Sequence, residues 1–356
     1  MSQSDHIRHN RGAHRDPEDA LENGGGEDLA IPTDSGSAVH ISNTSNVHTI
    51  IESNRRRQRR RLDLDMTPVR PDHCSALIKV LEDGSDVLFA HTTWDSYSNA
   101  APRIFKRYHL ATMEGALEMH FSSSPGMLSS VDDFYTINAW RKPLPSEQGD
   151  TSPGERLSVS LAITETSLDV FNEQAIQNII PEALLSWVRV RVANELSASG
   201  REWAENFETH FSGTYSNQWM VMDLNKFDGE AAAAAGRGGG GMEGTPLKEG
   251  FLTILEEVPG LLMWQDVTET LSSKGYWASY NMPYFTNIAE RSGADARCQV
   301  NPDECHDTAP RALQFAQQQA SVVDVESLQS VISYNDYKDD PVSLGNSCRT
   351  IACRED

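Results

Sequence analysis

The 356-residue sequence contains no apolar run that approaches the roughly 18 residues of a membrane-spanning helix. Its first part, residues 1–30, is polar and lacks the hydrophobic segment of a secretory signal peptide. We therefore expect no transmembrane span, and no signal peptide is visible in this sequence.

Basic residues are few, because 30 Lys and Arg stand against 52 Asp and Glu and give a formal net charge of −22. Nucleic-acid binding needs a basic surface that neutralises phosphates. The exception is RRRQRRR at residues 55–61, a run of the kind found in nuclear-import and RNA-binding segments. Because it is one short run in an acidic chain, we predict a solvated linker there and no nucleic-acid partner.

Several catalytic and cofactor motifs are absent as well. The sequence has no glycine-rich phosphate loop, no HExxH zinc motif and no GxSxG nucleophile elbow. No metal and no cofactor are therefore predicted.

Only five cysteines occur, and four of them form two close pairs in polar, loop-like stretches. The spacings of seven and five residues do not match the Cys-x2-Cys spacing of zinc sites, so a metal site is the weaker alternative. We predict two disulfides and an oxidising compartment, and a single sequon at residues 43–45 is a weak further sign of secretion. The pairs are Cys298 with Cys305 and Cys348 with Cys353. Cys74 is left outside both pairs.

The composition divides the chain into a tail and one large domain. Residues 1–72 are rich in Ser, Asp, Asn, Gly and Arg and have little apolar periodicity, so we expect a disordered tail or the remnant of a pro-segment. Residues 73–356 are long enough for a single domain with a sizeable core. The Ala/Gly-rich stretch at 229–244 is predicted to be a flexible insertion in a loop.

The order of the expected elements is strands, two helices, strands and then helices, which favours a layered α+β sandwich. The segment 101–110 fits either a strand or a surface helix. An amphipathic helix is predicted from residue 181 to 194 or 199, with an apolar stripe that contains Leu184, Leu185, Val188, Val192 and Leu196. Other strands are expected at 74–82, 86–94, 156–167, 216–227 and 250–267, and other helices at 201–211, 310–320 and 323–333.

The first two strands flank an Asp-Gly turn and predict a β-hairpin with Cys74 near its start. If residue 81 pairs with residue 86, Cys74 lies opposite Thr93 and Ala76 opposite His91, and all four share one face. The Cα atoms of Cys74 and His91 are then roughly 7–8 Å apart. A cysteine nucleophile needs a nearby base, which an imidazole supplies. The alternatives are a buried filler at 74 and an ordinary polar strand residue at 91.

Five stretches resemble the phospholipase B-like family of lysosomal and secreted proteins, in the order in which that family has them. They are HCSALIKVLEDGSDVLFAHTTW, FSGTYSNQWMVMDLNKF, LTILEEVPGLLMWQDVTETL, YWASYNMPYF and SYNDYKDDPVSL. The resemblance extends from about residue 70 to the C-terminus. It implies an α+β fold, the four-layer αββα sandwich of N-terminal-nucleophile hydrolases, and a lysosomal or extracellular location.

The resemblance also implies how the site is built. The family's precursor cleaves itself before a cysteine, which places the cut between His73 and Cys74. The freed α-amino group, whose pKa is ordinarily about 7.7–8.0, is then the base for the thiol. Asn281 matches the position of the oxyanion donor, and His91 and Arg311 match positions that shape the pocket and tune its charge.

Four further positions match the substrate pocket of the family or the residues that support it. Trp94 completes a His-x-x-Trp pattern with His91, and Thr166 of ITETS takes the place of the pocket threonine. Asn217 and Trp219 of NQW match supporting positions.

These matches predict an acyl hydrolase that removes fatty acyl chains from glycerophospholipids. An amidase-like hydrolase of linear amides uses the same nucleophile and stays open as an alternative. Family members also carry a long N-terminal fragment and further C-terminal residues, whereas 73 residues precede Cys74 here. A catalytically inactive, truncated family member is therefore the second alternative.

Overall fold

The computed structural model describes residues 29–32, 38–41, 73–94, 102–111, 115–130, 134–141, 157–229 and 246–354. The chain divides into two units, residues 1–69 and 70–356. In the first unit, strands β1 (Leu29–Pro32) and β2 (Ala38–Ile41) pair as a small antiparallel sheet, which the expectation of a disordered tail did not include. The basic run, the sequon and almost all of the 229–244 insertion lie outside the described residues.

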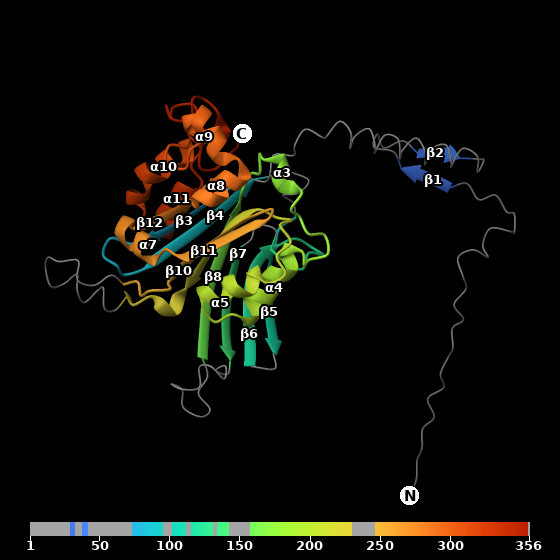
Figure 1. The fold of residues 1–356 in the computed structure, drawn as a ribbon, viewed down its shortest axis with the longest axis horizontal. Helices are drawn as coiled ribbons and strands as arrows, with labels where there is room; N and C mark the ends of the chain where they lie inside the picture. The colour runs from blue at the N-terminus through green and yellow to red at the C-terminus, as the bar shows by residue number, and fades with distance from the viewer. Residues whose placement is uncertain are drawn as a thin grey trace, which may run out of the picture. The chain divides into compact units, whose positions relative to one another are not determined.

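The second unit is built on a seven-stranded antiparallel sheet in the order β11-β10-β9-β8-β7-β6-β5 (Figure 1). Each strand pairs with its neighbour in the chain, so the sheet is a meander. The segment 101–110, which fitted either a strand or a helix, contains most of strand β5. Lys106, Tyr108 and Leu110 are half-buried at every second position, which is the period of a strand. The strands are β5 (Ile104–Ala111), β6 (Gly115–Ser123), β7 (Phe134–Arg141), β8 (Leu157–Ser167), β9 (Asn217–Asp223), β10 (Leu252–Val258) and β11 (Leu261–Asp266).

A three-stranded antiparallel sheet contains the predicted hairpin, in the order β12-β3-β4. The strands are β3 (His73–Val80), β4 (Val87–Trp94) and β12 (Tyr276–Ser279). The expected register is confirmed, since Cys74 lies opposite Thr93 and Ala76 opposite His91. Strand β12, where no strand was predicted, pairs with the other edge of β3.

Strand β3 is buried on both faces, and the alternation of its side chains divides the core. Ala76 and Ile78 pack against the large sheet, whereas Leu77 packs against helices on the opposite side. The first of these clusters joins the two sheets through Trp277 of β12 and Met220 of β9.

Helices cover the faces of the sheets that point away from each other (Figure 1). Helices α4 (Ser186–Leu196) and α5 (Gly200–Glu208) pack on the large sheet, where Trp203 and Phe207 meet Trp219. Helices α10 (Pro310–Gln318) and α11 (Val325–Ile332) pack on the small sheet through Phe315 and Leu328. The fold is therefore of the predicted α+β class, with mixed helices and antiparallel sheets.

Helix α4 differs from its prediction in start and in orientation. Leu185, still extended, is the N-cap, and the preceding residues form turns, so the helix begins at Ser186 and not at 181. The expected apolar stripe is wrong, because Leu185 and Leu196 are 51% and 58% exposed. The buried face contains Ser186, Arg189, Val190, Ala193 and Asn194. Arg189 and Asn194 can be buried here because they find hydrogen-bond partners in Phe207 and Trp203, which apolar spacing does not report.

The other helices are short: α3 (Glu173–Ile176), α7 (Thr268–Lys274), α8 (Thr286–Ser292) and α9 (Ala294–Val300). Both predicted disulfides, Cys298–Cys305 and Cys348–Cys353, are formed, and Cys74 belongs to neither. Within the part of the chain that the structure describes, no helix is long and apolar enough to span a membrane.

The buried ion pair of α4 makes a testable contribution to stability. Arg189 lies 3.0 Å from the Glu257 carboxylate and donates to the Phe207 carbonyl at 2.8 Å. Arg189→Met leaves Glu257 without its cation, so we expect the free energy of unfolding to fall by about 3–5 kcal/mol.

The matched control is Arg191→Met, which removes the more exposed Arg191–Glu195 pair of the same helix. This change should cost less than about 1 kcal/mol in urea unfolding at pH 8, where Glu257 is ionised. Equal losses in the two variants would contradict the assignment.

Candidate active site

Cys74 is almost completely buried, and three of its atoms form hydrogen bonds with other residues. Its thiol donates to Thr93 Oγ1 at 3.3 Å, and its backbone N–H donates to Asn281 Oδ1 at 3.2 Å. Its carbonyl oxygen accepts from Arg311 Nη1 at 2.7 Å. The position of the residue is therefore fixed along the backbone as well as at the sulfur.

Asn281 connects segments that are distant in the sequence. It follows β12 with a φ of 66°, a left-handed conformation that asparagine tolerates better than most residues. Its Oδ1 accepts from Cys74 and from Arg311, and its Nδ2 donates to the Ser167 carbonyl at 2.7 Å. The predicted oxyanion role requires this nitrogen, which here is turned towards Ser167.

Arg311 provides a cation next to the cysteine. Pro310 starts α10 at its first position, which places Arg311 in the first turn of the helix. Its Nη1 lies 2.8 Å from Asn281 Oδ1 and 3.2 Å from Ser75 Oγ, in addition to its bond to the Cys74 carbonyl. Burial lowers the pKa of Arg311 to about 10, with Cys74 and Tyr280 opposing the shift, so the group is charged at neutral pH.

The predicted pair His91 and Trp94 divides between the two faces of β4. His91 is half-buried and lies on the face of Cys74, two positions from Thr93. Trp94 lies on the other face, where its ring centroid is 5.5 Å from the Arg311 guanidinium carbon. The structure thus places Trp94 next to Arg311, and His91 on the same face of the hairpin as the Cys74 thiol.

Thr166 lies where β8 meets the small sheet. Its hydroxyl is 2.6 Å from Ser279 Oγ of β12, and both side chains are buried. The next residue, Ser167, is the acceptor for Asn281. Thr166 therefore fixes the end of β8 against the strand that leads to Asn281.

Asn217 and Trp219 are not part of this cluster. Thr166 pairs with Gln218, and in a strand the residues on either side of Gln218 point to the opposite face. On that face Asn217 Nδ2 donates to Glu165 at 2.6 Å, and Trp219 packs against Trp203. The supporting position that does face the small sheet is Gln218.

Gln218 belongs to a buried network that holds the segment after Asn281. It donates to Glu256 Oε1 at 2.6 Å and accepts from Trp277 Nε1 at 3.3 Å. Glu256 also accepts the backbone N–H groups of Tyr284 and Phe285 at 2.6 and 3.0 Å. Burial raises the pKa of Glu256 to about 7, although all three donors act in the opposite direction.

Comparisons with known proteins identify the family of the chain. A model of the Phospholipase B family matches residues 34–356. The chain belongs to the Phospholipase B family. Phospholipase B-like 1 of Homo sapiens is 39% identical over 288 residues, which are 80% of this chain and 46% of that protein. Phospholipase-B 81 of Drysdalia coronoides is 36% identical with the same coverage, so the chain spans about half the length of these curated relatives.

A more distant member of the Phospholipase B family covers the same region. Phospholipase B-like protein B of Dictyostelium discoideum is 34% identical over 293 residues, which are 81% of this chain and 45% of that protein. The match to the family thus includes relatives from vertebrates and from an amoeba, at 34–39% identity.

Sequence reasoning missed several residues of the site in this family member. Thr93 had a signal, since the hairpin register placed it opposite Cys74. Ser167 and Glu256 had none, because their roles depend on contacts between separate elements. Within the described residues, no group of three or more His, Cys, Asp and Glu side chains is arranged to hold a metal ion.

Glu256 should make the stability of the protein depend on pH. Its pKa rises from 4.5 to about 7 on folding, so the unfolded chain loses this proton first and stability falls as the pH rises through that window. Glu256→Gln removes the titration. We expect a smaller decrease of the unfolding temperature between about pH 5 and pH 8 than in the wild type.

The control is Glu182→Gln, which replaces an exposed glutamate and should leave the wild-type decrease unchanged. Thermal unfolding followed by circular dichroism measures both variants. A Glu256→Gln variant with the full wild-type decrease would show that Glu256 does not titrate in this range.

Proposed function

We propose that the chain is an acyl hydrolase in which Cys74 becomes the N-terminal residue by self-cleavage after His73. The observation that carries this proposal is the hydrogen bond from the Cys74 backbone nitrogen to Asn281 Oδ1. A nucleophile within a chain needs only its thiol positioned, whereas an N-terminal nucleophile also needs its nitrogen positioned. Both are held here.

The proposed cleavage is an acyl shift followed by hydrolysis. The Cys74 sulfur attacks the carbonyl carbon of His73, the peptide C–N bond breaks, and the thiol proton passes to the Cys74 nitrogen. Water then hydrolyses the thioester, which leaves a carboxylate on His73 and a free amine and thiol on Cys74. Arg311 binds the Cys74 carbonyl and keeps the strand end in place after the cut.

In the proposed reaction the free amine takes the proton of its own thiol, since an α-amino group has a pKa of about 7.7–8.0. The cation of Arg311 stabilises the thiolate, which attacks the acyl carbonyl. Asn281 holds the amine through Oδ1, and its Nδ2 donates to the oxyanion once it leaves Ser167. His91 and Thr166 shape the space on the same side of β3.

The substrate class that we propose is the glycerophospholipids, and the support for it is the name phospholipase carried by the relatives. We further propose that the two sheets and their helices form the αββα sandwich of N-terminal-nucleophile hydrolases. A lysosomal or extracellular location agrees with the two disulfides, which persist in oxidising compartments.

Cleavage is tested directly by mass spectrometry of the purified protein. The wild type should yield a fragment that starts at Cys74, and Cys74→Ala should remain intact and release no fatty acid from phosphatidylcholine. Cys74→Ser retains a weaker nucleophile and should be slower in both steps. A wild-type chain that stays intact and is as active as Cys74→Ala would contradict the proposal, and faster release from an N-acyl amide would favour the amidase alternative.

Substitutions at Asn281 separate its two hydrogen-bonding roles. Asn281→Asp keeps an oxygen for the Cys74 nitrogen and tolerates the left-handed backbone, but it loses the Nδ2 donor. We expect this variant to cleave itself and to lose about 10²–10³-fold in kcat, the usual effect of removing one oxyanion donor.

Asn281→Ala removes the oxygen as well and should also slow the appearance of the fragment that starts at Cys74. Circular dichroism checks that both variants are folded. If the Asp variant retains full kcat, the Nδ2 group is not an oxyanion donor.

A further inference from the structure

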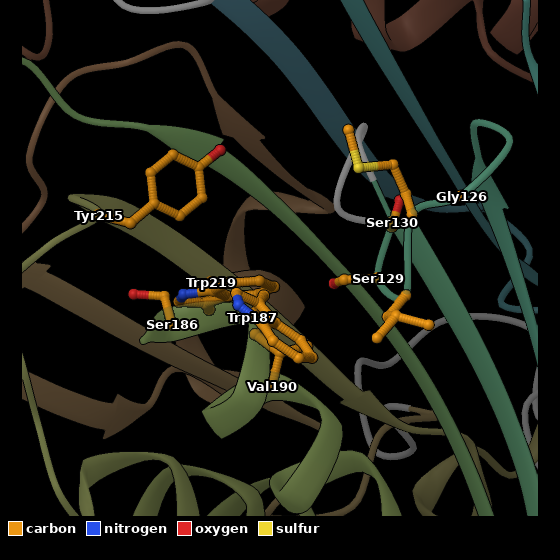
Figure 2. A pocket seen from close by; sticks show the side chains of 10 residues that line it. Gly126, Ser129, Ser130, Ser186, Trp187, Val190, Tyr215 and Trp219 are labelled. Carbon is orange, nitrogen blue, oxygen red and sulfur yellow. The ribbon is translucent and has the colours of Figure 1, made fainter. Parts of the chain in front are cut away.

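A cavity lies apart from Cys74, at the N-terminal end of α4 (Figure 2). Its volume is about 400 Å³, within the range of small-molecule pockets. Trp187, Val190 and Trp219 gather on one side, and the turn between β6 and β7 lies on the other. The lining residues are Gly126, Met127, Leu128, Ser129, Ser130, Ser186, Trp187, Val190, Tyr215 and Trp219.

The cavity and the cysteine lie on opposite faces of the large sheet. Trp219 lines the cavity and packs with Trp203 of α5, whereas its neighbour Gln218 bonds to Trp277 of the small sheet. The two sites therefore share strand β9 but not the same face, and a ligand in the cavity does not touch Cys74.

The walls are apolar and preformed. The indoles of Trp187 and Trp219 and the side chain of Val190 form one wall. In the opposite turn the Ser129 hydroxyl bonds to the Tyr135 hydroxyl, whose oxygen also accepts from the Ser130 N–H at 2.8 Å, so this wall is held in place. At the rim, Met127, Leu128 and Trp187 are 54%, 60% and 44% exposed. These side chains leave apolar surface open beside an apolar cavity.

The polar groups of the cavity fit an uncharged oxygen. Leu185 gives α4 no side-chain cap, and its carbonyl oxygen accepts first from the Val188 N–H at 3.0 Å, so the N–H groups of Ser186 and Trp187 have no capping side chain. Ser186 is buried, and among the residues that the structure describes its hydroxyl has no hydrogen-bond partner. An ether, carbonyl or hydroxyl oxygen of a ligand would satisfy such donors.

Charge decides between a neutral and an anionic ligand. None of the ten lining residues carries a charge. An ionisable group that bonds to the lining is Glu165, which accepts from the Tyr215 hydroxyl at 3.2 Å. A carboxylate or phosphate would therefore enter a site that contains no lining cation and lies close to a buried acid.

We propose that this cavity binds the hydrocarbon chain of a neutral, single-chain amphiphile, with the oxygen of its head at Ser186 and the start of α4. The chain contacts Trp187, Val190 and Trp219, and the head lies near Tyr215. Because the site does not include Cys74, the proposal does not depend on the hydrolase chemistry.

The test uses 1-O-alkylglycerols, which are neutral, have one chain and contain no ester or amide to cleave. Titration of the full chain, followed by tryptophan fluorescence and calorimetry, should show saturable binding of one molecule. Affinity should rise by about fourfold for each added methylene until the cavity is filled. Dodecanoate should bind at least tenfold more weakly than 1-O-dodecylglycerol.

Leu128→Glu places a charge at the rim and should weaken binding of 1-O-dodecylglycerol at least tenfold, without loss of the folded circular dichroism spectrum. The control is Val300→Glu, at a position that is 86% exposed and outside the cavity, and it should bind as the wild type does. Absence of saturable binding, or equal affinity in the two variants, would overturn the site. Equal affinity for dodecanoate would overturn the assignment of a neutral ligand.

Discussion

The Asn281 side chain holds together three parts of the chain that are distant in sequence. Its amide group bonds to Cys74 at the start of β3, to Ser167 at the end of β8 and to Arg311 in the first turn of α10. The two sheets and a helix of the outer face of the small sheet therefore meet at one side chain. A residue that has both an acceptor and a donor and also tolerates a left-handed backbone is suited to this position.

Buried carboxylates of the large sheet support this meeting point. Glu256 accepts from Gln218 and from two backbone N–H groups of the segment that follows Asn281, Glu257 pairs with Arg189, and Glu165 accepts from Asn217. Burial raises the pKa of both Glu256 and Glu257 to about 7, so each remains costly to ionise even with its partners. Ionising these two carboxylates at neutral pH therefore lowers the stability of the fold. Their hydrogen bonds hold the segment after Asn281 and helix α4 in place on the sheet.

The alternation of side chains along β8 and β9 separates two sites. Thr166 and Gln218 point to the small sheet, and Asn217 and Trp219 point to the helices and the apolar cavity. A motif such as NQW therefore contributes to two different environments within three residues. The resemblance carries over whole motifs, so it grouped Asn217 and Trp219 with Thr166 as residues of the pocket or its support, whereas the register places them on opposite faces of the sheet.

The sequence by itself determined the hairpin around Cys74, its register, both disulfides, the α+β class and the family. These features depend on short-range patterns or on motifs that are read in order along the chain. The tertiary structure decided which way Asn281 turns its amide, that Gln218 rather than its neighbours faces the small sheet, and that α4 buries Arg189 and exposes its leucines. Those choices depend on hydrogen-bond partners 18 to 207 residues away, which no local period records.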